Sequence, residues 1–530
     1  MRNFFAANLS ALLAFAVSLP AAEPAKTAPS AASITLPATT DPGRPKRYVT
    51  ILDCVQAAIQ QNLDVSIQRL NPAISAADVQ AAEGIFDVNW VTAFSESENL
   101  RPPGFSSSSL VTTPAPPINT RTYSYQQNLT GLSPIGTEYT LGFNGSRQQS
   151  SLFTGSPGPQ WTMFMGATVT QPLLKGFGWD VNTAQIRIAR KNQDISYQQF
   201  VQLVMQTVSN VKQAYYDLHY AIENVKVKEQ SVELAKRFLD ESRKRMQVGT
   251  MARLDVVQAE AELSQRDGEL IDAIRQWDES DLAYKQLISR DVLSIREVLL
   301  LPVERPSVVA MPIDPLDSIR QGLDNRPEYL QSKLQLDLNH IQLKYYKNSL
   351  LPQVDLAASY GYNAINQGNI NEDFSQLSKN FDSVYDRNYP TWSAGLTITV
   401  PLGNTTARGN HRHWKLAVEQ ALLSLKKTEQ TIIVGVELAV IQARAKAKLI
   451  ASSQATTRLR QESYAAEVEK LKAGTSTTYT VLQMQRDLND ARVIELKAIA
   501  DYNKALVALS HQEGTILKRS GVTVEPESKK

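Results

Sequence analysis

The chain has 530 residues, enough for several ordinary domains, and a formal net charge of +2 from 55 basic and 53 acidic side chains. A chain this close to neutral does not carry the basic face that a nucleic-acid binder needs. The single cysteine, Cys54, excludes an intramolecular disulfide framework and any metal site built from several cysteines. The mean hydropathy of −0.27 excludes a polytopic helical membrane protein.

The N-terminus predicts a secretory signal peptide over residues 1–22. A basic start at Arg2 precedes an apolar run that ends at Leu19, and small residues follow it. The alternative is a single transmembrane anchor, for which the run is short, since a span needs roughly 20 apolar residues. Residues 23–47 are rich in Pro, Ala, Ser and Thr, and predict a flexible lead into the folded chain.

Glycine and proline, the main helix breakers, are missing from four long stretches. They are absent or occur only once over 184–248, 250–301, 410–473 and 475–513. These stretches predict two long helical hairpins, over 180–290 and 404–513. At 1.5 Å per residue, the longest helix would extend on the order of 100 Å. Such a rod has no core of its own and must pack along its length on neighbouring helices.

Apolar side chains recur in these stretches at alternating steps of three and four, the heptad spacing of packed helices. The first stripe comprises Val201, Val204, Val208, Val211, Tyr215, Leu218, Ile222 and Val225. The second comprises Leu263, Leu270, Ala273, Trp277 and Tyr284, and the third Leu488, Ala491, Ala498, Tyr502, Ala505 and Leu509. Heptads alone leave an ordinary coiled-coil dimer or bundle open.

The sequence pattern indicates an internal duplication. Gly249-Thr250 recurs as Gly474-Thr475, and the strand-like segment at 162–173 resembles that at 391–402. Each half predicts a short helix, a medium helix, strands, a long helix, a Gly-Thr turn and a second long helix. The expected boundaries are 48–300 for the first half, 301–315 for a proline-rich linker, 316–515 for the second half and 516–530 for a tail.

Strands are expected at about 86–172 in the first half and about 352–402 in the second. The segments 162–170, 353–362 and 391–400 alternate polar and apolar residues. The segment 86–95 stands where 352–361 stands in the second half, and 123–129 and 138–145 add two candidates. Long polar connections at 97–120, 146–160 and 364–388, opposite one short turn, are typical of outer-membrane barrels. A soluble β-sandwich is the alternative. The strands of one chain are too few to close a barrel, and closure therefore requires several copies of the chain.

These features resemble the outer membrane efflux protein family, the TolC-like outer membrane factors. The resemblance covers about residues 48–515 and rests on LDCVQAAIQQN at 52–62, on the Pro-Leu strand ends at 172–173 and 401–402, and on the turn motifs at 248–263 and 473–488. It implies a mainly α fold with membrane β: a duplicated α-helical barrel crossing the periplasm, and a trimeric transmembrane β-barrel in outer membrane lipid. It further implies a homotrimer that receives substrates from an inner-membrane pump through a periplasmic adaptor protein.

The expected strand count departs from this family pattern. The resemblance implies four strands per protomer, whereas the sequence predicts four in the first half alone and six in total. Either all six join the barrel, giving roughly 18 strands in a trimer, or the hairpin at 121–147 folds outside it.

The two Gly-Thr turns are the main candidate site. Gly249 and Gly474 can adopt the positive φ that ends a helix, and Thr250 and Thr475 are expected to help cap the helix that follows. The resemblance adds adaptor docking at the two tips, by Val248, Gly249, Thr250, Ala473, Gly474 and Thr475.

Entrance gating is the second candidate role. Some members of the family carry carboxylates past the second tip that form an anionic ring, but the matching Thr480 and Gln483 are uncharged here. We therefore expect neither that ring nor the cation it would bind. Asp255, with Asp487 and Arg486 nearby, is either a hydrogen-bonding gate between hairpins or a solvated carboxylate.

Enzymatic motifs are missing from the sequence. The pair His411 and His413 would point to different faces of a helix, so we expect no metal. The sequence has no P-loop, no G-x-S-x-G and no dinucleotide-binding glycine motif after a strand. We therefore expect a passive export duct without catalytic residues or cofactor. The competing hypothesis is a structural protein without a channel, such as a coiled-coil adhesin or spacer.

Overall fold

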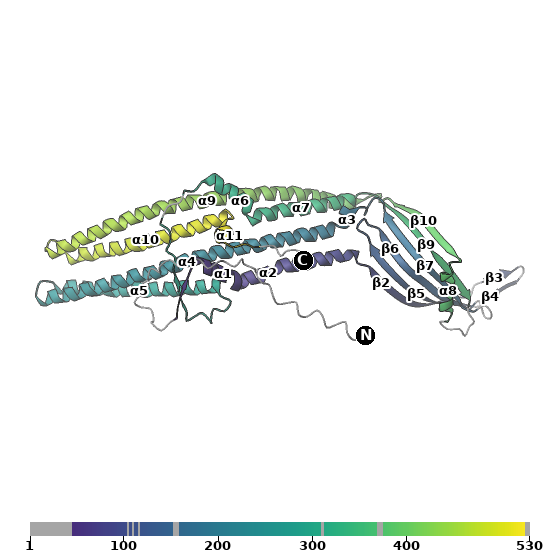
Figure 1. Cartoon of the computed structure of the whole chain (residues 1–530), viewed down its shortest axis with the longest axis horizontal. Helices are drawn as coiled ribbons and strands as arrows, with labels where there is room; N and C mark the ends of the chain where they lie inside the picture. Colours follow the sequence, from purple (N-terminus) through teal and green to yellow (C-terminus); the bar gives the residue numbers. More distant parts are fainter. Residues whose placement is uncertain are drawn as a thin grey trace, which may run out of the picture.

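The computed structural model describes residues 45–102, 105–108, 111–114, 117–151, 158–308, 312–367 and 375–524; the expected signal peptide and nearly all of the expected lead lie outside them. The molecule is elongated, with helical rods at one end and a twisted sheet at the other (Figure 1). Among the described residues, every helix is too short or too polar to cross a membrane.

The order of elements is similar in the two halves of the chain. The first half contains β1 (Lys46–Val49), α1 (Ile51–Gln61), α2 (Leu63–Glu83), the short 3-10 turn η1 (Gly84–Phe86), β2 (Asn89–Arg101), β3 (Phe105–Ser108), β4 (Val111–Pro114), β5 (Ile118–Leu132), β6 (Glu138–Ser150), β7 (Gln160–Pro172), α3 (Trp179–Asn182), α4 (Ala184–Gln247) and α5 (Arg253–Ile288). After β8 (Leu299–Pro302), the second half contains α6 (Pro315–Asn325), α7 (Pro327–Asn348), β9 (Gln353–Gln367), α8 (Ser375–Tyr385), β10 (Pro390–Thr399), α9 (Thr405–Lys472), α10 (Thr478–Gln512) and α11 (Ile516–Arg519).

Local signals explain where the short helices begin. Thr50 and Asp53 form a reciprocal capping box at the start of α1. Asn62 then interrupts the helix, and its side chain accepts hydrogen bonds from the first backbone N–H groups of α2. In the second half, α6 and α7 both start with proline, which is pre-shaped for the first helical turn.

The predicted rods are present, and their apolar stripes form the core. The long helix α4 has 64 residues and α9 has 68. Nearly all residues of the three heptad stripes are buried, with Tyr215, Tyr284 and Tyr502 fully so. The largest apolar cluster lies where α1, β1 and β8 meet α4 and α5. Cys54 is buried in it, and burial raises the pKa of the thiol to about 11.

Two boundaries differ from those expected. The linker at 301–315 begins inside β8, which pairs in parallel with β1 and buries Leu299, Leu300 and Leu301. The tail from 516 onward starts as α11, which packs on α4 with Ile516 fully buried. Both segments therefore pack against the middle of the molecule, because burying their apolar side chains is favourable.

Six strands form one antiparallel sheet in the order β10-β9-β7-β6-β5-β2. β5 and β6, which hold the hairpin at 121–147, lie between β2 and β7. The hairpin is therefore part of the same sheet as the other strands. The short strands β3 and β4 pair with each other in a separate ribbon. β10 and β2 are the two edges of the six-stranded sheet.

The two faces of this sheet differ in chemistry. Residues directly opposite each other on paired strands share a face, and neighbours along a strand alternate. The strand register gives one face that is apolar and aromatic, with Trp90, Phe94, Tyr125, Leu129, Leu141, Phe143, Met163, Met165, Val169, Leu356, Tyr360, Tyr362, Trp392, Leu396 and Ile398. The register puts small polar residues on the other face, with Ser95, Ser124, Gln126, Asn128, Asn144, Ser146, Thr162, Thr168, Ser359, Asn363, Ser393 and Thr397.

Candidate functional site

The two Gly-Thr turns lie at the same end of the molecule, far from the sheet (Figure 1). Gly249 and Gly474 have the same backbone angle, with φ of 77°. No atom lies within 4 Å of where a Cβ would stand at either position. Backbone conformation alone therefore requires glycine here, because an L side chain strains the left-handed region.

Thr250 and Thr475 cap the helix before them, which corrects the expected direction. The amide and hydroxyl of Thr250 both donate to the carbonyl of Arg245, at 2.9 and 3.0 Å. The amide and hydroxyl of Thr475 donate in the same way to Lys470, at 3.0 and 3.2 Å. Each threonine follows a left-handed glycine, and this reversal turns it back towards the last free carbonyls of the preceding helix.

The six residues predicted to dock an adaptor are placed on two exposed tips. Val248 is 74% exposed, although its side chain is apolar. Ala473 and the two Gly-Thr pairs are exposed as well. The arrangement offers two matched turns for a partner, and adaptor docking remains a prediction.

The predicted gating residues make local contacts. Asp255 accepts a hydrogen bond from the amide of Ala252, at 3.3 Å, and so caps its own helix, α5. Thr480 bonds to Thr477 at the start of α10, and Gln483 is exposed. Asp487 pairs with Arg460 of α9, at 2.7 Å, within the second hairpin. Asp255 thus makes an exposed capping contact within its own helix, and a gating role for it remains a prediction.

A buried ionic link joins the two hairpins elsewhere, and sequence reasoning missed it. Arg486 of α10 donates through Nε to Glu262 of α5, at 2.8 Å. On its other side, Glu262 accepts from Arg266, at 2.8 Å. The side chains of Glu262 and Arg266 are only 4% and 3% exposed. In the sequence, the spacing of these charges indicates a solvated helix face, and only the packing shows that they are buried.

The link extends to the long helix α4. Arg266 also pairs with Glu269, at 2.9 Å, and Glu269 pairs with Lys228 of α4, at 2.7 Å. Burial raises the pKa of the Glu269 carboxyl, but hydrogen bonds and charges from Lys228 and Arg266 outweigh it and lower the pKa overall. The hydrogen bond with Glu262 raises the pKa of Arg486. Glu269 and Arg486 therefore stay ionised near neutral pH. We name Lys228, Glu262, Arg266, Glu269 and Arg486 the inter-hairpin network.

Two further polar contacts hold α10 against α4. Asn489 donates to the hydroxyl of Ser231, at 2.7 Å, in a buried position. Lys504 pairs with Asp217, at 2.7 Å. Asn489 and Ser231 are buried, so loss of their hydrogen bond would be costly, and this contact helps to fix the relative position of the hairpins. The pair of Lys504 and Asp217 is partly exposed and contributes less.

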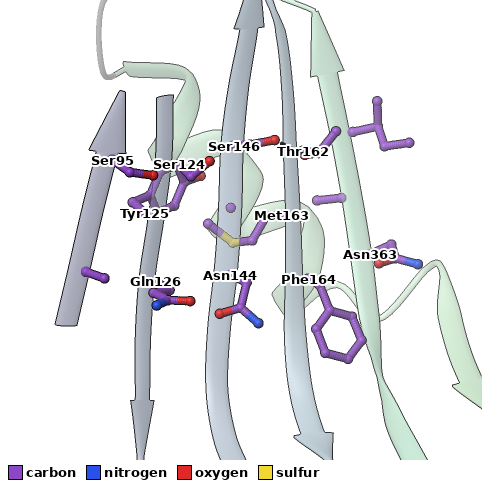
Figure 2. A pocket seen from close by; sticks show the side chains of 14 residues that line it. Ser95, Ser124, Tyr125, Gln126, Asn144, Ser146, Thr162, Met163, Phe164 and Asn363 are labelled. Carbon is purple, nitrogen blue, oxygen red and sulfur yellow. Dashed lines mark hydrogen bonds between the residues drawn. The ribbon is translucent and has the colours of Figure 1, made fainter. Parts of the chain in front are cut away.

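The polar face of the sheet forms a shallow concavity of about 630 Å³. Figure 2 shows Ser124, Gln126, Asn144 and Ser146 along its wall. Serine and asparagine side chains bond across the strands, as Ser146 does with Thr162 at 2.8 Å and Asn128 with Asn144 at 3.0 Å. The wall is uncharged and largely polar, with Phe164 and Ile365 as apolar exceptions, and its lining holds no group suited to acid–base chemistry.

The histidine pair shows no sign of a ligand set. His413 lies edge-on to Trp414, with ring centroids 5.2 Å apart. Across the residues that the structure describes, no group of three or more His, Cys, Asp or Glu side chains is placed to hold a metal ion.

Comparison with known proteins agrees with this architecture. A family model described as outer membrane efflux protein matches residues 138–289 and 318–515. The outer membrane protein TolC of Escherichia coli K12 is 22% identical over 406 residues, which is 74% of this chain and 78% of TolC.

Solved outer membrane channels share the fold at low sequence identity. The Campylobacter jejuni channel CmeC superposes with a TM-score of 0.62 at 16% identity, over 88% of this chain and 85% of CmeC. The Vibrio cholerae outer membrane protein VceC superposes with a TM-score of 0.61 at 13% identity, over 88% of this chain and 96% of VceC. The fold is thus TolC-like, and the related proteins are channels of the outer membrane and not enzymes. The family model covers most of the chain, so this protein belongs to the outer membrane efflux protein family.

Proposed function

We propose that this protein is the passive exit duct of a tripartite efflux pump or a type I secretion system, assembled from three copies of the chain. An inner-membrane pump would supply the energy, and a periplasmic adaptor would join the pump to the helical tips. The observation that carries this proposal is the two-faced sheet with two unpaired edges. A wettable wall behind an apolar face is what a water-filled channel in a membrane requires.

The sheet edges support closure between copies. β2 is exposed along almost its whole length, with Trp90 and Phe94 72% and 75% exposed. At the other edge, Trp392 of β10 is 75% exposed. Unpaired edges are templates for pairing, and β2 and β10 run in opposite directions. β2 of one copy can therefore pair antiparallel with β10 of the next, and three copies give a closed barrel of about 18 strands.

The helical layer has two matching edges as well. In this layer α4 contacts α2 on one side and α7 on the other, and α7 contacts α9. The outer side of α2 carries an exposed apolar stripe: Leu63, Ile67, Leu70 and Ile74. The first part of α9, nearest to the sheet, exposes Leu416 and Leu423. Head-to-tail packing of the α2 edge on the α9 edge would close a ring.

Oligomeric mass tests this assembly. The detergent-purified wild-type protein should have the mass of three chains by native mass spectrometry. The double variant Ile67→Asp with Ile74→Asp should fall apart into monomers, because charges would stand in the apolar contact. Gln80→Asp, on another side of α2, is the matched control and should stay trimeric. A monomeric wild-type protein in the outer membrane would overturn the proposal.

Adaptor docking at the tips is tested separately. Val248 is exposed and apolar, so a photo-crosslinking amino acid placed there should capture a periplasmic adaptor protein in living cells. The same amino acid at Glu233, exposed on the side of α4 well before the tip, is the control. Equal capture at both positions, or none at Val248 while export is active, would contradict docking at the tips.

A further inference from the structure

Helix α8 occupies an unexpected position on the sheet. The connection at 364–388 is expected to be a long polar loop, yet it contains α8 (Ser375–Tyr385) at the end of the sheet far from the helical rods (Figure 1). The helix contacts β7 and β9. Its apolar side chains Phe381 and Val384 pack towards Met163 and Ala364. The Phe381 ring also meets that of Phe143 edge-on, with centroids 4.9 Å apart.

The register shows which face of the sheet α8 covers. Met163 is paired directly with Ala364 and with Gly145, and Phe143 with Met165. These residues belong to the apolar face. In Figure 2 the strands pass in front of α8, while the polar side chains line the concavity on the other side. The helix thus lies behind the wall and outside the polar hollow.

A polar anchor holds the helix in this place. Asn380 is fully buried between α8 and the sheet. It accepts a hydrogen bond from Asn366, near the end of β9, at 2.5 Å. A polar group buried in an apolar contact is costly unless it is bonded, so this pair favours one seating of α8 over sliding along the face.

We propose that α8 lies on the lipid side of the channel wall, where its outer surface contacts the outer-leaflet lipids at the level of their phosphate-bearing headgroups. The apolar face of a membrane barrel is the face that meets lipid. The helix sits on that face, so it occupies space that lipid would otherwise fill and leaves the outer mouth of the channel open. The inference rests on the outer-membrane location and the sheet's two faces, and not on the pump or the adaptor.

The outer surface of α8 suits a membrane boundary. Tyr385 is 87% exposed, and Tyr389, just beyond the helix, is 66% exposed. Lys379 and Arg387 stand on the same segment and are exposed, and two exposed acidic residues, Asp382 and Asp386, stand beside them. Aromatic rings with a polar tip collect at the membrane–water boundary, and long cationic side chains reach lipid phosphates from there. Trp392, on the neighbouring strand β10, continues this surface along the apolar face.

Cysteine labelling can locate α8, because the native Cys54 is buried and its raised pKa makes it a poor target for thiol reagents. Three single variants would carry an environment-sensitive fluorophore: Tyr385→Cys on α8, Leu396→Cys on the apolar face, and Gln126→Cys on the polar face. Each would be reconstituted in phosphatidylethanolamine–phosphatidylglycerol vesicles with acyl chains brominated near the headgroup. The label at Tyr385→Cys should lose fluorescence as the label at Leu396→Cys does, while the label at Gln126→Cys keeps it.

A second readout separates the lipid side from the channel interior. A bulky maleimide on Gln126→Cys should lower single-channel conductance, and the same reagent on Tyr385→Cys should leave it unchanged. An unquenched label at position 385, or a loss of conductance on labelling there, would overturn the proposal. If the unlabelled protein forms no channel at all, the proposed function fails, and quenching by brominated lipid still decides the position of α8.

Discussion

The two helical hairpins share their turns but differ in the charges behind them. Both tips use a left-handed glycine and a threonine that bonds back five residues. Glu262 in the first hairpin and Asp487 in the second occupy matching positions after their turns. Glu262 is 4% exposed and joins the hairpins, whereas Asp487 is 32% exposed and pairs within its own hairpin. The duplication therefore preserved the turn, while only one copy of the acidic position became part of the inter-hairpin network.

Replacing Glu262 should produce the largest effect. Glu262→Ala removes one of the two acidic partners of the buried Arg266 and breaks the bond to Arg486, so the free energy of unfolding should fall by about 3 kcal/mol. Asp487→Ala, at the matching and partly exposed position, should lower the free energy of unfolding by less than about 1 kcal/mol. Thermal denaturation in detergent measures both variants. Equal losses would show that the two positions do not differ in the way that their burial indicates.

Substitution of the tip glycines should give intermediate and equal effects. Gly249→Ala and Gly474→Ala each force an L side chain into the left-handed region, at a cost of about 1 kcal/mol. Empty space surrounds both positions, so no steric term should separate them. The same denaturation experiment compares them, and a large difference between the variants would contradict the equivalence of the two turns.

Acid should weaken the network by a smaller amount. The folded-state pKa of Glu269 lies below the ordinary glutamate value of 4.5, so its contribution to stability is present above about pH 4.5 and is lost as the pH falls through the lower folded value. Glu269 is partly exposed, so its ion pairs with Lys228 and Arg266 should contribute less than about 1 kcal/mol to the free energy of unfolding. Melting temperatures of the wild-type protein and Glu269→Gln should differ near pH 7 and converge at lower pH. A constant gap would argue against titration of Glu269.

The threonine hydroxyls should contribute least. Thr250→Val and Thr475→Val keep the shape of the side chain and the backbone hydrogen bond but remove one bond to a helix-end carbonyl. Each should cost about 0.5 kcal/mol, since these bonds are exposed to water. A markedly greater loss in thermal denaturation would mean that the hydroxyls serve the following helix as well.

Much of the architecture follows from local patterns, and the parts that do not follow depend on distant contacts. The absence of glycine and proline over 184–248 is sufficient to predict α4, because helix breakers act locally. Pairing of β8 with β1 is not predictable in this way, since four apolar residues at 299–302 carry no period of their own. The helix α8 likewise stands in a segment whose average composition is polar, and its apolar residues find their partners on strands far away in the sequence.

The candidate site likewise has parts that the sequence predicts and parts that depend on packing. Glycine at the two tips is predictable because backbone geometry requires it. The direction in which Thr250 bonds is not, because helices flank it on both sides. Glu262 and Arg266 stand four residues apart, a spacing typical of solvated pairs, and their burial arises from packing of α5 against α4 and α10.

Single-channel conductance of the purified wild-type protein in planar bilayers tests the duct most directly. We expect long-lived, discrete conductance steps from a three-chain assembly, without any added energy source. Trimers that are folded by their helical content and insert into the bilayer, yet pass no current even when Arg486→Ala severs the link between the hairpins, would contradict it.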